Sequence, residues 1–120
     1  MLDSHWALEF ARDWIDAWNS HDLDRILSHY AQDFEMSSPL IAERMNEPSG
    51  VLKGKRAIRP YWEKGLASQP PLRFELVNVF IGVESITICY RSIGRRMAAE
   101  VLFFNAQREV VRGMAHYGEP

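Results

Sequence analysis

One stretch of the sequence, residues 6–30, limits the folds open to this chain more than any other. Its aromatic residues Trp6, Phe10, Trp14 and Trp18 recur every four positions, which is the spacing of one face of an amphipathic helix. The polar residues between them fall on the opposite face. Three indoles on one stripe need a large concave surface to pack against, and the rest of the chain must provide it.

A second helix is predicted directly after the first. Residues 19–22 interrupt the helical period, and Asp22 is a suitable N-cap for a new helix. Residues 23–30 then carry apolar side chains at i, i+3, i+4 and i+7, ending at Tyr30. We therefore expect two helices joined by a short acidic turn, with Tyr30 in the second.

The remainder of the chain changes from helical to strand periodicity. Residues 34–38 alternate and predict a short strand that ends at Pro39. Residues 39–53 predict a long loop with one helical turn at 40–45, and residues 54–67 predict a third helix. Four alternating segments with short connections follow and predict an antiparallel meander. These segments are residues 72–81, 85–91, 96–104 and 109–117.

Several of these strands carry apolar residues on both faces. Alternation in the first of them places Phe74, Leu76 and Phe80 on one face and Val77 and Val79 on the other. A sheet of this kind is covered on both sides. The helices can cover one side, and a second copy of the chain is the natural cover for the other. We therefore expect a homodimer formed through the sheet.

The composition excludes several classes of protein. The 120 residues suit one domain, and a net charge of −2, from 14 basic and 16 acidic residues, gives no basic excess for nucleic acid or an anionic membrane surface. Cys89 is the only cysteine, and the histidines have no metal-ligand spacing. We expect no metal and no cofactor. Without a signal-like N-terminus or a long apolar run, we expect a cytoplasmic location.

Four sequence motifs, in this order and spacing, resemble one known superfamily. They are AWNSHDLD at the end of the first helix, FEMSSP in the short strand, GKRAIRPYW at the third helix, and VLFFNAQREVVRGMAHYG in the last hairpin. Together they resemble the nuclear transport factor 2-like superfamily, and within it the SnoaL-like branch, which includes ketosteroid isomerases and polyketide cyclases. The resemblance covers residues 1–120. It implies an α+β, cystatin-like fold, in which three N-terminal helices wrap a strongly bent antiparallel sheet into a cone with a ligand pocket.

The same resemblance indicates which catalytic groups are present. Ketosteroid isomerases use a carboxylate base, a tyrosine donor and a protonated aspartic acid. In this chain Ser38 stands where the base precedes a proline, Trp14 where the tyrosine lies, and Glu100 where the aspartic acid lies. Serine cannot abstract a carbon-bound proton unaided, and an indole is a much weaker acid than a phenol. We therefore do not expect ketosteroid isomerase activity.

Glu100 is the most informative residue for function. Its neighbours of the same strand parity are Ala98, Leu102 and Phe104, so its carboxyl group is predicted to point into apolar surroundings, where burial raises the pKa. This would make it a general acid or a hydrogen-bond donor. The alternative is a glutamate that reaches solvent or pairs with a nearby arginine, such as Arg112.

The aromatic residues are core residues by their spacing, and the resemblance adds a role for some of them in the pocket. We expect Glu100, Tyr30 and Ser38 to be catalytic. The expected ligand-binding residues are Trp14, Trp18, Phe34, Met36, Tyr61, Trp62, Leu102 and Tyr117. The expected ligand is a small apolar or cyclic molecule.

Three functions are compatible with this sequence. The first is a proton-transfer enzyme of the isomerase, cyclase or dehydratase type that uses Glu100. The second is a non-catalytic protein that binds a small ligand. The third is a dimeric association domain whose pocket has lost its role. One fold supports all three, so the choice between them depends on the site itself.

Overall fold

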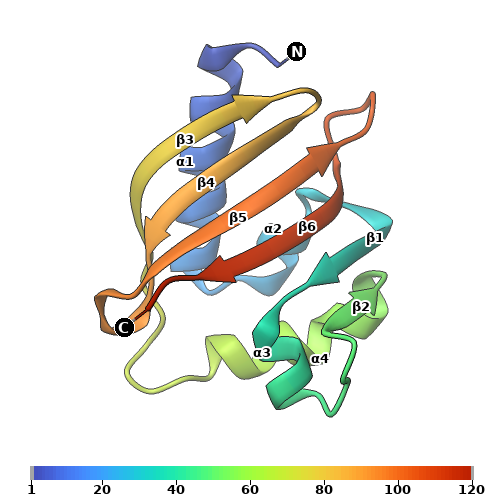
Figure 1. Ribbon diagram of the computed structural model, residues 1–120, viewed down its shortest axis with the longest axis vertical. Helices are drawn as coiled ribbons and strands as arrows, with labels where there is room; N and C mark the ends of the chain where they lie inside the picture. The colour runs from blue at the N-terminus through green and yellow to red at the C-terminus, as the bar shows by residue number, and fades with distance from the viewer. Residues whose placement is uncertain (1, 120) are drawn as a thin grey trace.

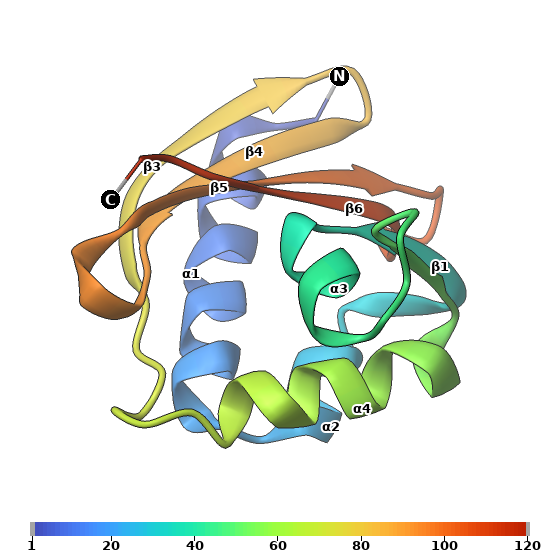
Figure 2. The ribbon, with the colours of Figure 1, turned by 60° about the horizontal axis from the view of Figure 1, so that its bottom comes forward.

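The computed structural model describes residues 2–119, in which a six-stranded sheet curves around the helices (Figures 1 and 2). The helices are α1 (Ser4–Ser20), α2 (Leu23–Leu27), α3 (Pro39–Arg44), α4 (Lys55–Leu66) and the short 3₁₀ helix η1 (Ile93–Arg95). The strands are β1 (Tyr30–Ser37), β2 (Val51–Lys53), β3 (Glu75–Gly82), β4 (Ser85–Arg91), β5 (Met97–Phe104) and β6 (Val110–Tyr117). This is the predicted α+β architecture with a strongly bent sheet.

The predicted antiparallel meander of four strands is present as β3 to β6, but the sheet as a whole is mixed, whereas the resemblance implied an antiparallel one. Its strand order is β2-β1-β6-β5-β4-β3, and β1 pairs with β6 in the parallel direction, with Met36 opposite Gly113. The other four pairings are antiparallel. The alternation of side chains is the same in either direction, so the sequence pattern carried no information on this pairing. Figure 2 shows the helices together beneath the concave face of the sheet.

The first helix forms as predicted, and the second is shorter than predicted. The Asp3 carboxylate caps α1 by accepting a hydrogen bond from the backbone N–H of Trp6, and Asp22 caps α2 in the same way at Arg25. The second helix ends at Leu27, and Tyr30 is the first residue of β1. A residue spacing that fits one face of a helix had placed Tyr30 in the wrong element.

Residues 39–53 are more ordered than the predicted loop. Ser38 caps α3 through a hydrogen bond from the N–H of Leu40, with Pro39 in the first turn, where its missing N–H costs nothing. This helix continues to Arg44, and the chain returns as β2, which pairs with β1. The expected helical turn is therefore present, and it lies beside the open end of the curved sheet (Figure 2).

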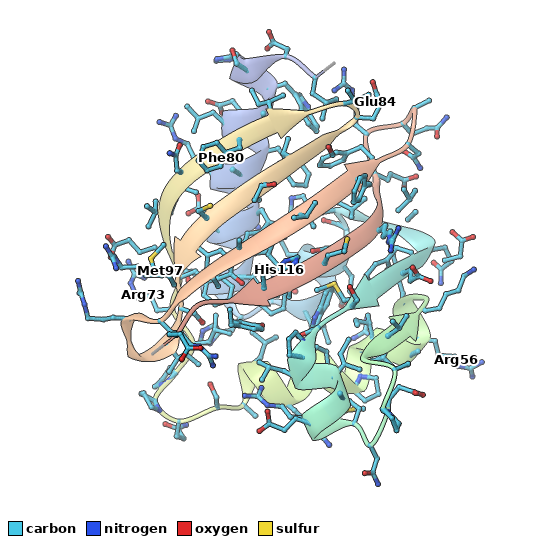
Figure 3. The ribbon with its side chains drawn as sticks, viewed as in Figure 1. Arg56, Arg73, Phe80, Glu84, Met97 and His116 are labelled. Carbon is cyan, nitrogen blue, oxygen red and sulfur yellow. The ribbon has the colours of Figure 1, made fainter. Side chains whose placement is uncertain are left out.

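A bulge in β3 reverses part of its predicted alternation. The pairing register with β4 shifts between Leu76 and Asn78, and one extra residue turns the rest of the strand over. Val79 consequently packs against the core, and Phe80 is 55% exposed, which is the opposite of the prediction for both. The face of the sheet that points away from the helices carries the half-buried residues Val101 and Met114, opposite each other on β5 and β6. Figure 3 looks onto this face.

Candidate functional site

A cavity of about 350 Å³ lies between the helices and the concave face of the sheet. Its fully buried residues, such as Trp14 and Tyr30, mark the deep end, and its exposed residues, such as Gln69 and Ile93, mark the mouth. The residues that line it are Trp14, Trp18, Tyr30, Met36, Leu40, Arg44, Tyr61, Trp62, Gly65, Ser68, Gln69, Leu72, Phe74, Tyr90, Ser92, Ile93, Arg96, Glu100 and Tyr117.

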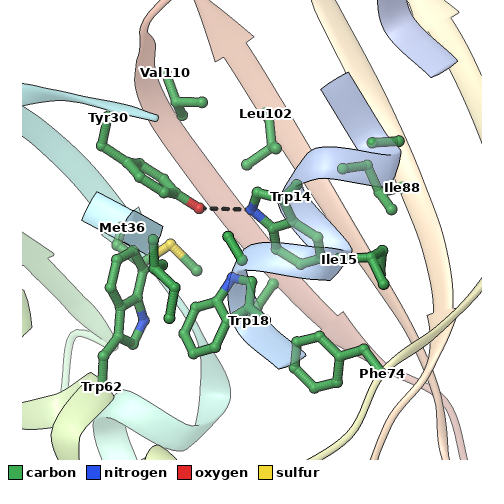
Figure 4. Close-up of a cluster of buried hydrophobic side chains, with 14 of the residues drawn as sticks. Trp14, Ile15, Trp18, Tyr30, Met36, Trp62, Phe74, Ile88, Leu102 and Val110 are labelled. Carbon is green, nitrogen blue, oxygen red and sulfur yellow. Dashed lines mark hydrogen bonds between the residues drawn. The ribbon is translucent and has the colours of Figure 1, made fainter. Parts of the chain in front are cut away.

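The aromatic wall of the cavity comes from three separate parts of the chain. Trp14 and Trp18 lie one turn apart on α1, so their indoles share a face, with ring centroids 6.1 Å apart. Trp62 from α4 meets Trp18 edge to face at 5.1 Å, and Phe74, just before β3, stacks on Trp14 at 5.9 Å. Figure 4 shows these rings around one space. Edge-to-face and offset packing of this kind fixes the orientation of each ring.

A hydrogen bond between α1 and β1 orients the phenol at the deep end. The indole Nε1 of Trp14 donates to the hydroxyl oxygen of Tyr30 over 3.0 Å (Figure 4). An indole nitrogen is a donor only, so the Tyr30 hydroxyl keeps its own hydrogen for another acceptor. Burial, and then the nearby Glu100, raise the pKa of Tyr30 well above its usual range. Tyr30 therefore stays a neutral donor at any physiological pH.

The side chain of Glu100 is buried with one carboxyl oxygen unpaired. Strand alternation points it to the concave face, and it is only 5% exposed. The Tyr90 hydroxyl donates to its Oε1 over 3.1 Å, whereas its Oε2 has no partner among the described residues. Burial raises the pKa of Glu100 to about 7, and the Tyr90 hydrogen bond partly offsets that rise. At neutral pH this carboxyl group can therefore either donate or accept a proton.

A second unpaired polar group belongs to the same cavity. The Nε1 of Trp18 is buried and lacks an acceptor in the described part of the chain. An unpartnered buried donor costs free energy, on the order of 1–3 kcal/mol, unless a ligand or water supplies the acceptor. The cavity thus combines two N–H or O–H donors, on Trp18 and Tyr30, with an acid–base group on Glu100. A ligand oxygen suits this set.

Ser38 supports the wall without lining the cavity. Its hydroxyl oxygen accepts from the Leu40 N–H and from the Tyr61 hydroxyl over 3.3 Å. It also lies close enough to Tyr117 to lower the pKa of that phenol, against a larger rise caused by burial. Ser38 thereby fixes the start of α3 and the position of two tyrosines that do line the cavity.

The structure brings most of the predicted site residues together. Those on the cavity wall are Glu100, Tyr30, Trp14, Trp18, Met36, Tyr61, Trp62 and Tyr117. Ser38, Phe34 and Leu102 are not on it. Phe34 lies behind the wall, with its ring 4.5 Å from Tyr30 and 5.7 Å from Trp62, and Leu102 is fully buried in the core. Both side chains point to the inner face of the sheet, as strand alternation predicts, but other side chains separate them from the cavity.

Sequence reasoning missed several residues of this cavity. Tyr90 is opposite Ala98 on the neighbouring strand and points inward with it. The sequence did not indicate which face of the sheet the side chain of Tyr90 points to. Phe74 was predicted only to share one face of its strand with Leu76 and Phe80. Arg44 and Arg96 lie in or beside a short helix and a turn, where no periodicity indicates a direction.

The described residues contain neither a cluster of metal-ligating side chains nor a helix that could span a membrane. Within residues 2–119, no group of three or more histidine, cysteine, aspartate or glutamate side chains is arranged to hold a metal ion. None of the helices in the same range combines the length and the apolar character required to cross a membrane.

Comparison with known proteins identifies the family. The SnoaL-like domain matches residues 11–118. A solved SnoaL-like protein of unknown function from Burkholderia thailandensis is 49% identical, with a TM-score of 0.93 over 98% of each chain. Among curated proteins, none matches.

Two more distant structures share the fold alone. An epoxide hydrolase/cyclase-like enzyme, SalBIII, with a role in pyran ring formation in the polyether salinomycin, is 15% identical, with a TM-score of 0.77 over 98% of this chain and 95% of that one. A protein with a cystatin-like fold from Methylobium petroleophilum is 17% identical, with a TM-score of 0.76 over 98% of this chain and 79% of that one. The chain belongs to the SnoaL-like domain family.

Proposed function

We propose that this protein binds a small apolar or cyclic molecule in its cavity and catalyses a proton transfer on it through Glu100. The observation that carries the proposal is the unpaired Oε2 of a buried carboxyl group whose pKa lies near 7. A general acid or base works best when its pKa is close to the working pH. Perturbed carboxyl groups in apolar cavities are common at catalytic sites.

The roles of the other residues follow from their contacts. A ligand oxygen would accept hydrogen bonds from Tyr30 and Trp18, whose donors have no acceptor within residues 2–119. When the carbon–hydrogen bond next to a ligand carbonyl breaks, the proton passes to Oε2 of Glu100. The electron pair of that bond moves toward the carbonyl oxygen of the ligand, which Tyr30 and Trp18 stabilise by hydrogen bonds. Tyr90 holds the carboxyl group through Oε1. Return of that proton to a different carbon completes an isomerisation. In a dehydration the proton passes instead to a hydroxyl group on the next carbon, which leaves as water, and in a cyclisation the enolate carbon attacks a carbonyl of the same ligand, whose oxygen takes the proton.

The remaining predicted catalytic residue has a positioning role in this proposal. Ser38 touches Tyr61 and caps α3, so it holds the wall rather than the reacting atoms. SalBIII is described as an epoxide hydrolase/cyclase-like enzyme, and acid–base ring closure belongs to the reaction class proposed here.

A non-catalytic binding protein is the alternative function. It is favoured by one observation: Glu100 is the only carboxylate among the described residues that line the cavity. Many enzymes of this kind use a separate acid and base. A binding protein needs only the aromatic wall and the donors that hold a ligand oxygen.

We also propose that the protein acts as a homodimer through the outer face of its sheet. Val101, Phe103 and Met114 form a half-buried apolar patch on that face. Association of two identical patches around a twofold axis would remove it from water.

An assay with a surrogate ketone tests the proton transfer without knowledge of the natural substrate. The ketone 2-tetralone is small, bicyclic and mostly apolar, and loss of its α-protons in D2O can be followed by proton NMR. The wild-type protein is expected to accelerate the exchange, and Glu100→Gln to remove the acceleration. Equal rates for the two proteins would contradict the catalytic proposal and leave the binding protein as the better interpretation.

A further inference from the structure

The charged residues of the cavity are unevenly placed. Glu100 lies at the deep end, whereas Arg44 and Arg96 lie at the mouth. No other charged side chain lines the cavity within residues 2–119. A largely aromatic cavity thus has two cations at its entrance and one buried carboxyl group at its other end.

Both arginines lie near Tyr117. The guanidinium carbon of Arg96 lies 5.2 Å from the centre of that ring, and its Nε donates to the carbonyl oxygen of Gly118 over 3.0 Å. Arg44 lies on the other element, at the end of α3, close enough to the phenol oxygens of Tyr117 and Tyr61 to favour their ionised forms. The two cations therefore both lie near Tyr117 on the cavity wall.

Neither guanidinium group has a carboxylate partner among the described residues, although the chain pairs other arginines. Arg25 pairs with Asp13, and Arg59 with Asp24. By contrast, the terminal guanidinium nitrogens of Arg44 and Arg96 make no hydrogen bond or ion pair to another part of residues 2–119, and the Nε of Arg96 donates to the carbonyl oxygen of Gly118. A guanidinium group recognises carboxylate, sulfonate or phosphate oxygens through parallel hydrogen bonds.

We propose that the natural ligand is an amphipathic anion, with an apolar ring system against the indoles and an acidic group held at the mouth by Arg44 and Arg96. This inference rests on the proposed function, since it requires the cavity to be the ligand site. It adds the orientation of the ligand: the anionic end faces solvent, and the reacting oxygen faces Glu100, Tyr30 and Trp18.

Two dyes that differ by one charged group test the inference. They are 1-anilinonaphthalene-8-sulfonate and N-phenyl-1-naphthylamine, which is the same molecule without the sulfonate. Their own emission reports binding. The wild-type protein is expected to bind the sulfonate about tenfold more tightly, the effect of roughly one charge-assisted hydrogen bond. Arg44→Gln and Arg96→Gln should each remove most of that preference and leave the neutral dye within about twofold.

Arg56→Gln is the matched control, since Arg56 is exposed on α4 and projects away from the sheet (Figure 3). It should leave the affinities of both dyes unchanged. Equal affinity of the wild-type protein for the two dyes, or a preference that survives both arginine substitutions, would overturn the inference while the binding site stands. Failure of both dyes to bind would overturn the proposed function itself, and the inference with it.

Discussion

The indole of Trp14 donates a hydrogen bond of 3.0 Å to the phenol oxygen of Tyr30, which joins α1 to β1 in the buried wall of the cavity. The bond sets the direction of the phenol. Because the Tyr30 oxygen accepts from Trp14, its hydrogen is free to point toward a ligand or toward Glu100. A helix residue thereby prepares a strand residue for its proposed role, and the pair can be tested as a unit.

The energetic coupling of Trp14 and Tyr30 is measurable by a double-mutant cycle. Trp14→Phe and Tyr30→Phe each remove one partner of the bond and keep most of the apolar volume. We expect a coupling free energy of about 1 kcal/mol in urea unfolding. Trp14→Ala should cost more, about 3–5 kcal/mol, because it also opens a cavity in the core. Strictly additive single effects would argue against the bond.

The pKa of Glu100 predicts how stability depends on pH. Its value is raised from 4.5 to about 7 in the folded protein, so the folded state binds this proton more tightly than the unfolded state. Glu100 therefore lowers the free energy of unfolding as pH rises from about 4.5 to about 7. The Glu100→Gln variant cannot ionise at this position. Between pH 4.5 and 7 its free energy of unfolding should therefore rise by about 3 kcal/mol relative to that of the wild type.

Carbon-13 NMR titration of the Glu100 carboxyl group measures the same property directly in the free protein. A midpoint near 7 is expected. Tyr90→Phe removes the donor to Oε1 and should move the midpoint higher, because that hydrogen bond favours the carboxylate. A midpoint near 4 would place Glu100 in contact with solvent and leave the proposed catalysis without its acid.

Isomerisation of a Δ5-3-ketosteroid should be absent or very weak. The base and phenol positions that the family resemblance assigns are Ser38 and Trp14, and Ser38 uses its oxygen to accept from Leu40 and Tyr61. General acid–base catalysis is worth roughly 10²–10⁴ in rate. An ultraviolet assay of the conjugated ketone measures this activity. Turnover near that of a genuine isomerase would show that these residues were wrongly matched.

The proposed dimer predicts a mass of two chains in light scattering at roughly ten micromolar protein. Val101→Glu places a charge at the centre of the outer face of β5 and should give a monomer. Val83→Glu is the matched control, since Val83 is 76% exposed in the turn between β3 and β4, and it should remain dimeric. A wild-type monomer at that concentration would contradict the proposal.

Strand parity predicted which face of the sheet the side chain of Glu100 points to. The alternation of β5 indicated that Glu100 shares a face with Ala98 and Leu102, and all three are buried. A residue period depends on local geometry alone, so the sequence is sufficient to predict it. The same rule failed at Phe80, because the bulge in β3 adds a residue and no local signal marks it.

Other features depend on contacts between distant parts of the chain. The end of α2 at Leu27, with Tyr30 in the sheet, is stabilised by pairing of Tyr30 with Val110, and tertiary pairing overrides a short helical pattern. Arg44 reaches the cavity only because α3 folds over its mouth. The family resemblance therefore indicated most residues of the deep end of the cavity, whereas neither the resemblance nor the sequence periodicity indicated the arginines of its entrance.

The positions of the four tryptophans make the protein a reporter of its own occupancy. Trp14, Trp18 and Trp62 line the cavity, whereas Trp6 packs against Phe104 and lies beneath the guanidinium of Arg108, 4.7 Å away. A molecule that enters the cavity must alter the intrinsic emission and near-ultraviolet dichroism of three indoles and leave the fourth as an internal reference. Libraries of unlabelled metabolites can consequently be screened by the protein's own signal, without a dye or a tag and before any reaction is assigned.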